Sequence, residues 1–195
     1  MQDSEYKIGT IDPAEIIARF CPVNSKAYRI LERHGRRVAD KSLRVAAAVP
    51  HLKPDPAFIE EAAILHDIGM VGVDAPKLGF WGNSPQICHG LIGRVMLAEL
   101  GLPRHGLVCE RHVGVGLSAA DIERNGFPLP VRDMRPVSTD EIIIAYADKF
   151  FSKHPDDLER EKSIEEVIEH ISRYGGSAVA TFMDWAGRFG EARPG

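Results

Sequence analysis

The stretch Glu61-Ala-Ala-Ile-Leu-His-Asp-Ile-Gly69 decides the fold class and the chemistry of this chain. An apolar run of helical character ends there on His66 and Asp67, just before a glycine. An imidazole and a carboxylate at the end of a buried helix are costly unless something compensates them, and a metal ion compensates both. A helix C-terminus alone favours the histidine but not the carboxylate, whose charge is wrong for that end. We therefore expect a buried helix that ends in a metal site.

The segments around this stretch predict more helices and no clear hairpin. Helix-start residues and apolar periodicity indicate helices over residues 13–20, 25–50, 56–67, 84–100, 103–112 and 138–152, followed by one or two amphipathic helices. Residues 71–82 are rich in glycine and predict a loop, and the stretch with Pro128, Pro130 and Pro136 predicts irregular structure. The expected fold class is all-α, in a single domain.

Composition narrows the class of protein. The chain has 195 residues, of which 44% are hydrophobic, and this is enough for one domain with a hydrophobic core. Its net charge of −4 argues against binding to duplex nucleic acid, which requires a basic surface. Three cysteines in no framework spacing indicate reduced thiols in a cytoplasmic protein. The start lacks the features of a signal peptide, and no uncharged apolar stretch is long enough for a membrane span. The sequence does not indicate an oligomeric state.

Four further residues look placed to complete a metal site with His66 and Asp67. They are His34, His89, His112 and Asp148. Each histidine taken alone is more often structural than a ligand. Asp148 interrupts an apolar helix, where a buried carboxylate is either bound to metal or paired with a cation such as Lys149 or a core arginine.

These six residues supply at least three ligands per ion if Asp67 bridges two ions. Imidazole with carboxylate suits iron, manganese, zinc or nickel better than calcium or magnesium. A thiolate zinc site of Cys88, His89, Cys109 and His112 is a weaker alternative, because no short Cys-x-x-Cys is present. The remaining histidines serve as controls and are expected at the surface: His51, His105, His154 and His170.

The order of a histidine, then His-Asp, then a distant aspartate resembles the HD superfamily of metal-dependent phosphohydrolases. The matching residues are His34, His66-Asp67 and Asp148 in Tyr146-Ala-Asp-Lys149, over roughly residues 25–152. The resemblance implies an HD-type helical bundle. We expect an N-terminal helical extension over residues 1–23, an HD metal-binding domain over 24–155, and C-terminal helices over 156–195 packed on the same domain.

His89 and His112 resemble two additional metal-ligand histidines in bacterial HD enzymes that split diadenosine tetraphosphate symmetrically. Cys88-His89-Gly90 leads to Glu99-Leu-Gly101, and Arg111-His-Val-Gly114 follows. That resemblance implies that Asp67 bridges two ions, with His34, His66 and Asp148 on one ion and His89 and His112 on the other. HD-type cyclic dinucleotide phosphodiesterases are a weaker match, because their Gly-Tyr-Pro element is missing here.

The closest resemblance is to short uncharacterised bacterial HD proteins. They share Pro128-Leu-Pro130, Arg132-Asp-Met134 and Ala147-Asp-Lys-Phe-Phe-Ser-Lys153. One departure concerns the substrate: many HD enzymes carry a phosphate-binding lysine directly after His-Asp-x-Gly, where this chain has Met70. Either another cation takes that role or the substrate differs. The candidates are Lys77, Arg132 and Lys149, although a charge of this kind is more often a solvated surface charge.

These observations predict a metal-dependent phosphohydrolase acting on a nucleotide or dinucleotide phosphate ester or anhydride. Hydroxide held by two metal ions would attack, and the ions would clamp the phosphoryl oxygens. Asp67 is the expected catalytic bridge, and Asp74 could protonate the leaving group. The alternatives are a one-metal nucleotidase using His34, His66, Asp67 and Asp148, and a non-catalytic nucleotide-sensing module with a structural metal. An open coordination position separates catalysis from a structural role.

Overall fold

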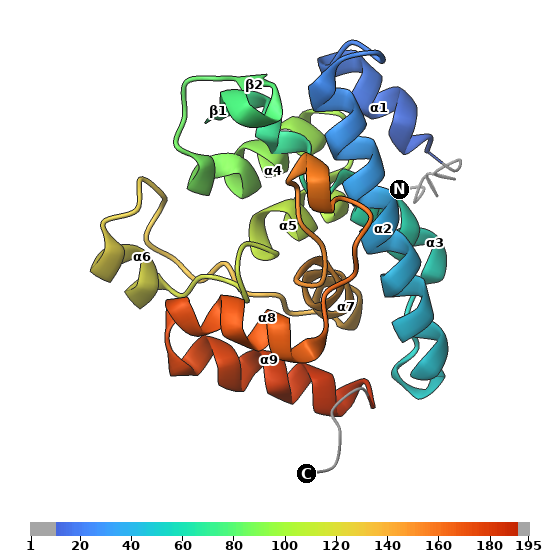
Figure 1. Ribbon diagram of the computed structural model, residues 1–195, viewed down its shortest axis with the longest axis vertical. Coiled ribbons are helices and arrows are strands. Elements are labelled where there is room, and N and C mark those ends of the chain that lie inside the picture. Colours follow the sequence, from blue (N-terminus) through green and yellow to red (C-terminus); the bar gives the residue numbers. More distant parts are fainter. Residues whose placement is uncertain (1–10, 191–195) are drawn as a thin grey trace, which may run out of the picture.

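A computed structural model describes residues 11–190 of the chain (Figure 1). Its helices are α1 (Pro13–Phe20), α2 (Lys26–Ala48), α3 (Pro56–Leu65), α4 (His89–Glu99), α5 (Pro103–Arg111), α6 (Ala119–Asn125), α7 (Thr139–Asp148), α8 (Ile164–Ile171) and α9 (Gly176–Arg188). The strands among these residues are β1 (Asp74–Ala75) and β2 (Phe80–Trp81), which form one antiparallel pair. The fold is therefore all-α, as predicted.

Local capping explains where several of these helices begin. The side chains of Asp12, Ser25, Asp55 and Ser138 accept hydrogen bonds from backbone N–H groups of the first turns of α1, α2, α3 and α7. Such acceptors satisfy donors that a helix start otherwise leaves unpaired. Proline at the first position of α1 and α3 removes one of those donors.

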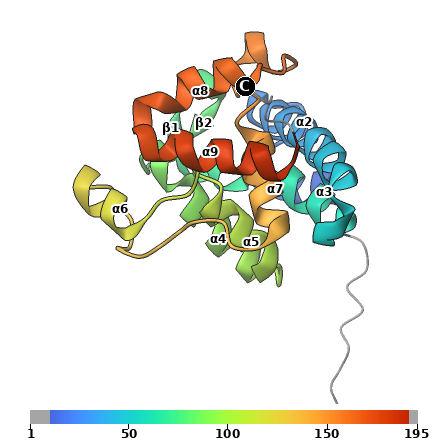
Figure 2. The ribbon, with the colours of Figure 1, turned by 90° about the horizontal axis from the view of Figure 1, so that it is seen from below.

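Helix α7 lies in the middle of the molecule and organises the packing. It contacts α2, α3, α5 and α9. Its residues from Ile143 to Ala147 are fully buried, and Tyr146 stacks on Phe182 of α9 with ring centroids 5.0 Å apart. Figure 2 shows α8 and α9 lying together across one face. One apolar core therefore runs from α1 through α7 to α9.

Four local predictions were wrong. The helix expected from residue 84 begins at His89, after a 3₁₀ turn over Gln86–Cys88. The residues between His112 and Ser138, expected to be irregular, contain α6, because Ser118 and Asp121 form a capping box and Gly126 ends the helix in a left-handed conformation. The glycine-rich loop contains the short pairing of Asp74 with Trp81 and Ala75 with Phe80. The helix expected to reach Ser152 ends at Asp148.

Candidate metal centre

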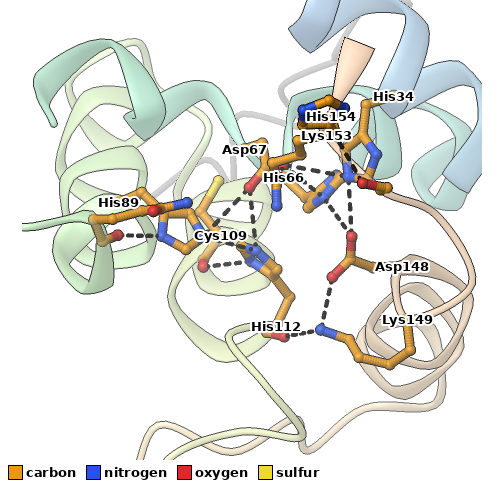
Figure 3. A network of polar contacts seen from close by, with 12 residues as sticks. His34, His66, Asp67, His89, Cys109, His112, Asp148, Lys149, Lys153 and His154 are labelled. Carbon is orange, nitrogen blue, oxygen red and sulfur yellow. Dashed lines mark hydrogen bonds and ion pairs between the residues drawn. The ribbon is translucent and has the colours of Figure 1, made fainter. Parts of the chain in front are cut away.

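The six candidate ligands converge because helix ends meet in the core. His66 caps the C-terminus of α3 and Asp67 follows it, His89 begins α4, His112 caps the C-terminus of α5, Asp148 ends α7, and His34 lies within α2. All six are buried. Figure 3 shows their side chains pointing toward one another.

Gly69 explains how the end of α3 comes so close to the start of α4. A Cβ atom on Gly69 would lie 2.0 Å from the carbonyl oxygen of His89 and 2.4 Å from the amide nitrogen of Gly93. Real Cβ atoms do not approach backbone that closely, so only glycine permits this contact. Close packing, rather than a left-handed backbone, therefore requires the glycine and brings His89 to Asp67.

One oxygen of Asp67 faces the first group of ligands. Asp67 Oδ2 lies 3.4 Å from His34 Nε2 and 3.3 Å from His66 Nε2. Asp148 Oδ1 lies 3.0 Å from His34 Nε2 and 3.3 Å from His66 Nε2. Four ligand atoms from three helices and the turn after α3 thus meet around one point.

The other oxygen of Asp67 faces the second group. Asp67 Oδ1 lies 3.3 Å from His89 Nε2 and 3.3 Å from His112 Nε2. The two imidazole nitrogens lie 3.1 Å from each other. Asp67 therefore stands between two sets of histidines and presents a different oxygen to each.

Backbone carbonyls orient three of the imidazoles. Nδ1 of His66, His89 and His112 lies 2.6, 2.7 and 2.8 Å from the carbonyl oxygens of Ala63, Gln86 and Cys109. A carbonyl only accepts, so each Nδ1 donates to its carbonyl and each ring turns Nε2 inward. In the deprotonated form that binds metal, the lone pairs of these Nε2 atoms face one another and the carboxylate oxygens, an arrangement that a cation at their centre stabilises.

The unpaired atoms and the spacing both fit metal ions. His66 Nε2 and both oxygens of Asp67 are buried and accept or donate no well-directed hydrogen bond. Two atoms each about 2.1 Å from a shared ion lie roughly 3.0 Å apart at a right angle and about 3.4 Å apart at the tetrahedral angle. The separations here run from 3.0 to 3.4 Å. The described residues include two groups able to hold an ion, His34–His66–Asp148 and His66–Asp67–His112.

Burial and charge prepare these groups as ligands. Burial opposes ionisation of Asp148, but the charges of Lys149 and Lys153 hold the pKa of its carboxyl well below the usual range. Burial also opposes ionisation of Asp67, but the charges of Lys153 and His66 hold the pKa of its carboxyl well below the usual range. Burial lowers the pKa of His34 and lowers that of His112 to about 3. These carboxylates are ionised and these two imidazoles neutral near pH 7, the forms in which they bind metal.

Two lysines border the centre, and sequence reasoning assigned only one. Lys149 Nζ lies 2.7 Å from Asp148 Oδ2 and donates a hydrogen bond to the carbonyl oxygen of His112 at 3.2 Å. Lys153 Nζ lies 2.9 Å from Asp67 Oδ2. Four-residue spacing from Lys149 was the available signal, but α7 ends at Asp148, so helical periodicity does not extend from Lys149 to Lys153.

The other candidates lie apart from the centre in the described part of the chain. Asp74 and Lys77 are exposed, and no described contact joins either to the six ligands. Arg132 pairs with Glu110, which also pairs with Arg94. Among the controls, His105 is buried at 7% exposure and contacts Glu61, so its surface prediction was wrong.

The thiolate alternative gains no support from the geometry. Cys109 Sγ donates to the carbonyl oxygen of Leu65 at 3.4 Å, and burial raises the pKa of this thiol. Cys88 Sγ lies 3.8 Å from the carbonyl oxygen of Pro128. Neither group of potential metal ligands within residues 11–190 includes a cysteine.

Sequence and structure comparisons place the chain among known proteins. Residues 31–152 match the profile of the HD domain. An uncharacterized protein of Methanocaldococcus jannaschii is 29% identical over 118 residues, which cover 59% of this chain and 62% of that protein. A tRNA (cytidine(56)-2'-O)-methyltransferase of Picrophilus torridus is 28% identical over 124 residues, 63% of this chain and 32% of that one. The chain thus spans less than two thirds of the length of either relative.

A solved structure supports the fold. The HD domain of the phosphodiesterase PgpH of L. monocytogenes superposes with a TM-score of 0.51 at 15% identity, covering 94% of this chain and 89% of that one. In the part of the chain that the structure describes, no helix has the length and apolar character needed to cross a membrane.

Proposed function

The chain belongs to the HD domain family, whose members are metal-dependent phosphohydrolases, and from this premise we propose that it hydrolyses a nucleotide or dinucleotide phosphate ester or anhydride at a centre of two metal ions. One observation carries the proposal: the two oxygens of Asp67 face different pairs of histidines at distances near 3.3 Å. A carboxylate in that position is suited to bridge two ions.

The proposed ligand sets follow from these distances. His34, His66 and Asp148 would hold one ion with Oδ2 of Asp67, and His89 and His112 would hold the other with Oδ1. Nitrogen with carboxylate oxygen favours iron, manganese, zinc or nickel. When bound, such ions supply a water of lowered pKa as nucleophile and neutralise charge on the phosphoryl oxygens.

Backbone carbonyls orient the proposed ligands, and a lysine side chain balances their charge. The carbonyl oxygens of Ala63, Gln86 and Cys109 fix the ring orientation of three imidazoles. Lys149 links the end of α7 to the end of α5 through Asp148 and the His112 carbonyl, and is one of the proposed candidates for a phosphate contact. Lys77 and Arg132 remain further candidates for phosphate contacts, and Asp74 for proton donation to the leaving group.

The test is a hydrolysis screen of metal-reconstituted protein across nucleotides, dinucleotides and their phosphate esters. We expect metal-dependent turnover of at least one phosphate substrate by protein that holds two ions per chain. One ion per chain with full activity would instead indicate the one-metal nucleotidase. Tightly bound metal without any turnover, together with nucleotide binding, would favour the sensing module.

A further inference from the structure

Lys153 reaches the metal centre from the segment that follows α7. Its ammonium lies 2.9 Å from Asp67 Oδ2 (Figure 3). Its side chain is 22% exposed, whereas that of Asp67 is 3% exposed. The histidines in contact with Asp67 are at most 9% exposed. Of the described contacts of Asp67, Lys153 is thus the most exposed to solvent.

The oxygen that Lys153 contacts is also one that a metal ion would use. Oδ2 of Asp67 lies 3.4 Å from His34 Nε2 and 3.3 Å from His66 Nε2, within the first group of ligands. A metal ion bound by this oxygen competes with the ammonium for it. A partly buried ammonium that loses its carboxylate needs another anion, because an unpaired charge away from water is costly.

The segment that carries Lys153 is fastened to the rest of the fold at Phe150 and again at residues 159–162. After Lys153 the chain is fastened by a hydrogen bond from Lys162 N to Phe150 O at 2.9 Å and by one from Arg37 Nη2 to Glu159 O at 3.0 Å. Lys41 Nζ lies 3.0 Å from Glu161 Oε1. A lysine has a flexible four-carbon stem and can redirect its ammonium without backbone movement.

The positions that the sequence offered for a phosphate contact carry no charge or already have partners. Met70, directly after His-Asp-Ile-Gly, is fully buried and carries no charge. Lys149 is engaged by both Asp148 and the His112 carbonyl. Arg132 pairs with Glu110. Lys153 is therefore the cation whose carboxylate partner metal binding would take away.

We propose that Lys153 binds the phosphoryl group of the substrate, its ammonium moving from Asp67 to a non-bridging phosphoryl oxygen when metal ions occupy the centre. This inference rests on the proposed function and assigns the phosphate contact that Met70 cannot supply. The ligand it recognises is an anionic phosphoryl group, whichever base or second phosphate the substrate carries.

The experiment compares Lys153→Gln with wild type in the metal-loaded state and titrates each with inorganic phosphate by calorimetry. An ammonium bonded to an anion contributes a factor of roughly 10 to 100 in affinity, so Lys153→Gln should weaken phosphate binding by that factor. Metal analysis should still find the wild-type number of ions, and metal affinity should rise because a competing cation is gone. Lys153→Arg should restore part of the phosphate affinity. Lys53→Gln, at an exposed lysine, is the matched control.

Phosphate affinity equal to wild type in Lys153→Gln, at unchanged metal content, would overturn the inference and leave the proposed function standing. The lysine would then be only a counter-ion for Asp67. A metal-loaded wild type that neither binds phosphate nor hydrolyses any phosphate substrate would overturn both. For any substrate that the protein hydrolyses, Lys153→Gln should raise KM by a larger factor than it lowers kcat.

Discussion

At the scale of single residues, Asp67 holds the two halves of the centre together. Each of its oxygens faces two histidine nitrogens, and neither oxygen accepts a well-directed hydrogen bond. The pKa of its carboxyl lies well below the usual range, because Lys153 and His66 outweigh the effect of burial. Loss of this one side chain should therefore affect both of the proposed ions, whereas loss of a histidine should affect one.

Asp67→Ala should lower the metal content from two ions per chain to none and reduce hydrolysis to background. His112→Ala should retain one ion, because the first ligand group is left complete. Plasma emission measurements on purified protein give the number of metal ions per chain directly. His51→Ala is the control, because His51 is exposed and should leave both values unchanged. Equal losses in Asp67→Ala and His51→Ala would refute the assignment.

His66 should release a proton when metal binds. Burial lowers its pKa, but the charges of Asp67 and Asp148 outweigh burial and raise it to about 9, so the metal-free imidazole is protonated at pH 7. A ligand nitrogen must be deprotonated, so metal uptake at pH 7 should release about one proton per chain from this residue. Calorimetric metal titrations in two buffers of different ionisation enthalpy measure that number. Above pH 9 the release should disappear, and a binding heat independent of buffer at pH 7 would contradict the prediction.

At the scale of elements, the centre depends on how the ends of helices approach each other. The C-terminus of α3 and the N-terminus of α4 meet at Gly69, where backbone from α4 occupies the space that a side chain would need. The turn after Asp67 and the first turn of α4 are therefore packed as one unit. A small change at this contact should move a ligand without altering any ligand.

Gly69→Ala should destabilise the protein and disturb the second ligand group first. Its Cβ would lie 2.0 Å from the carbonyl oxygen of His89, and overpacking of this kind costs about 1–3 kcal/mol or more. Urea unfolding gives the loss of stability, and metal analysis shows whether the ion of His89 and His112 is lost before the other.

Gly187→Ala in α9 is the matched control for that substitution. A Cβ there meets nothing within 4 Å, so the change should be neutral or should stabilise by up to about 1 kcal/mol. Similar unfolding midpoints for the two variants would show that the Gly69 contact is not as tight as the structure has it.

At the scale of the whole molecule, buried ionisable groups link stability to pH. His105 on α5 lies 3.2 Å from Glu61 on α3, and its ring packs edge-on against Phe58 at 4.9 Å. Burial lowers the pKa of His105, and the nearby Glu61 offsets this only in part. The unfolded chain therefore holds more protons on this residue than the native chain does below the ordinary histidine pKa of about 6.5.

The stability that neutral His105 contributes should be present above pH 6.5 and should fall as pH decreases through its lowered native pKa. His105→Gln cannot titrate, so on acidification from pH 7.5 to 5.5 the wild type should lose more unfolding free energy than the variant. Urea unfolding of metal-free protein at both pH values measures this difference and removes the contribution of metal loss. Parallel losses in the two proteins would show that His105 does not titrate in this range.

Local signals in the sequence were sufficient for much of the helical frame. Asp12, Ser25, Asp55 and Ser138 cap helices through atoms two or three residues away, so the chain itself encodes these starts. The missed helix α6 had such a signal as well, in Ser118 and Asp121. The end of α7 had none, which is why its predicted end was four residues too late.

The arrangement of the centre depended on tertiary structure. The sequence by itself determined which imidazoles and carboxylates fall on apolar helix faces and ends, because those patterns repeat within a few residues. Which oxygen of Asp67 faces which histidine was decided by packing, since the contact between His34 and Asp148 joins residues 114 positions apart. The role of Lys153 could not be predicted from the sequence for the same reason. This residue lies beyond α7, and only the path of the chain back toward α2 brings its ammonium to Asp67.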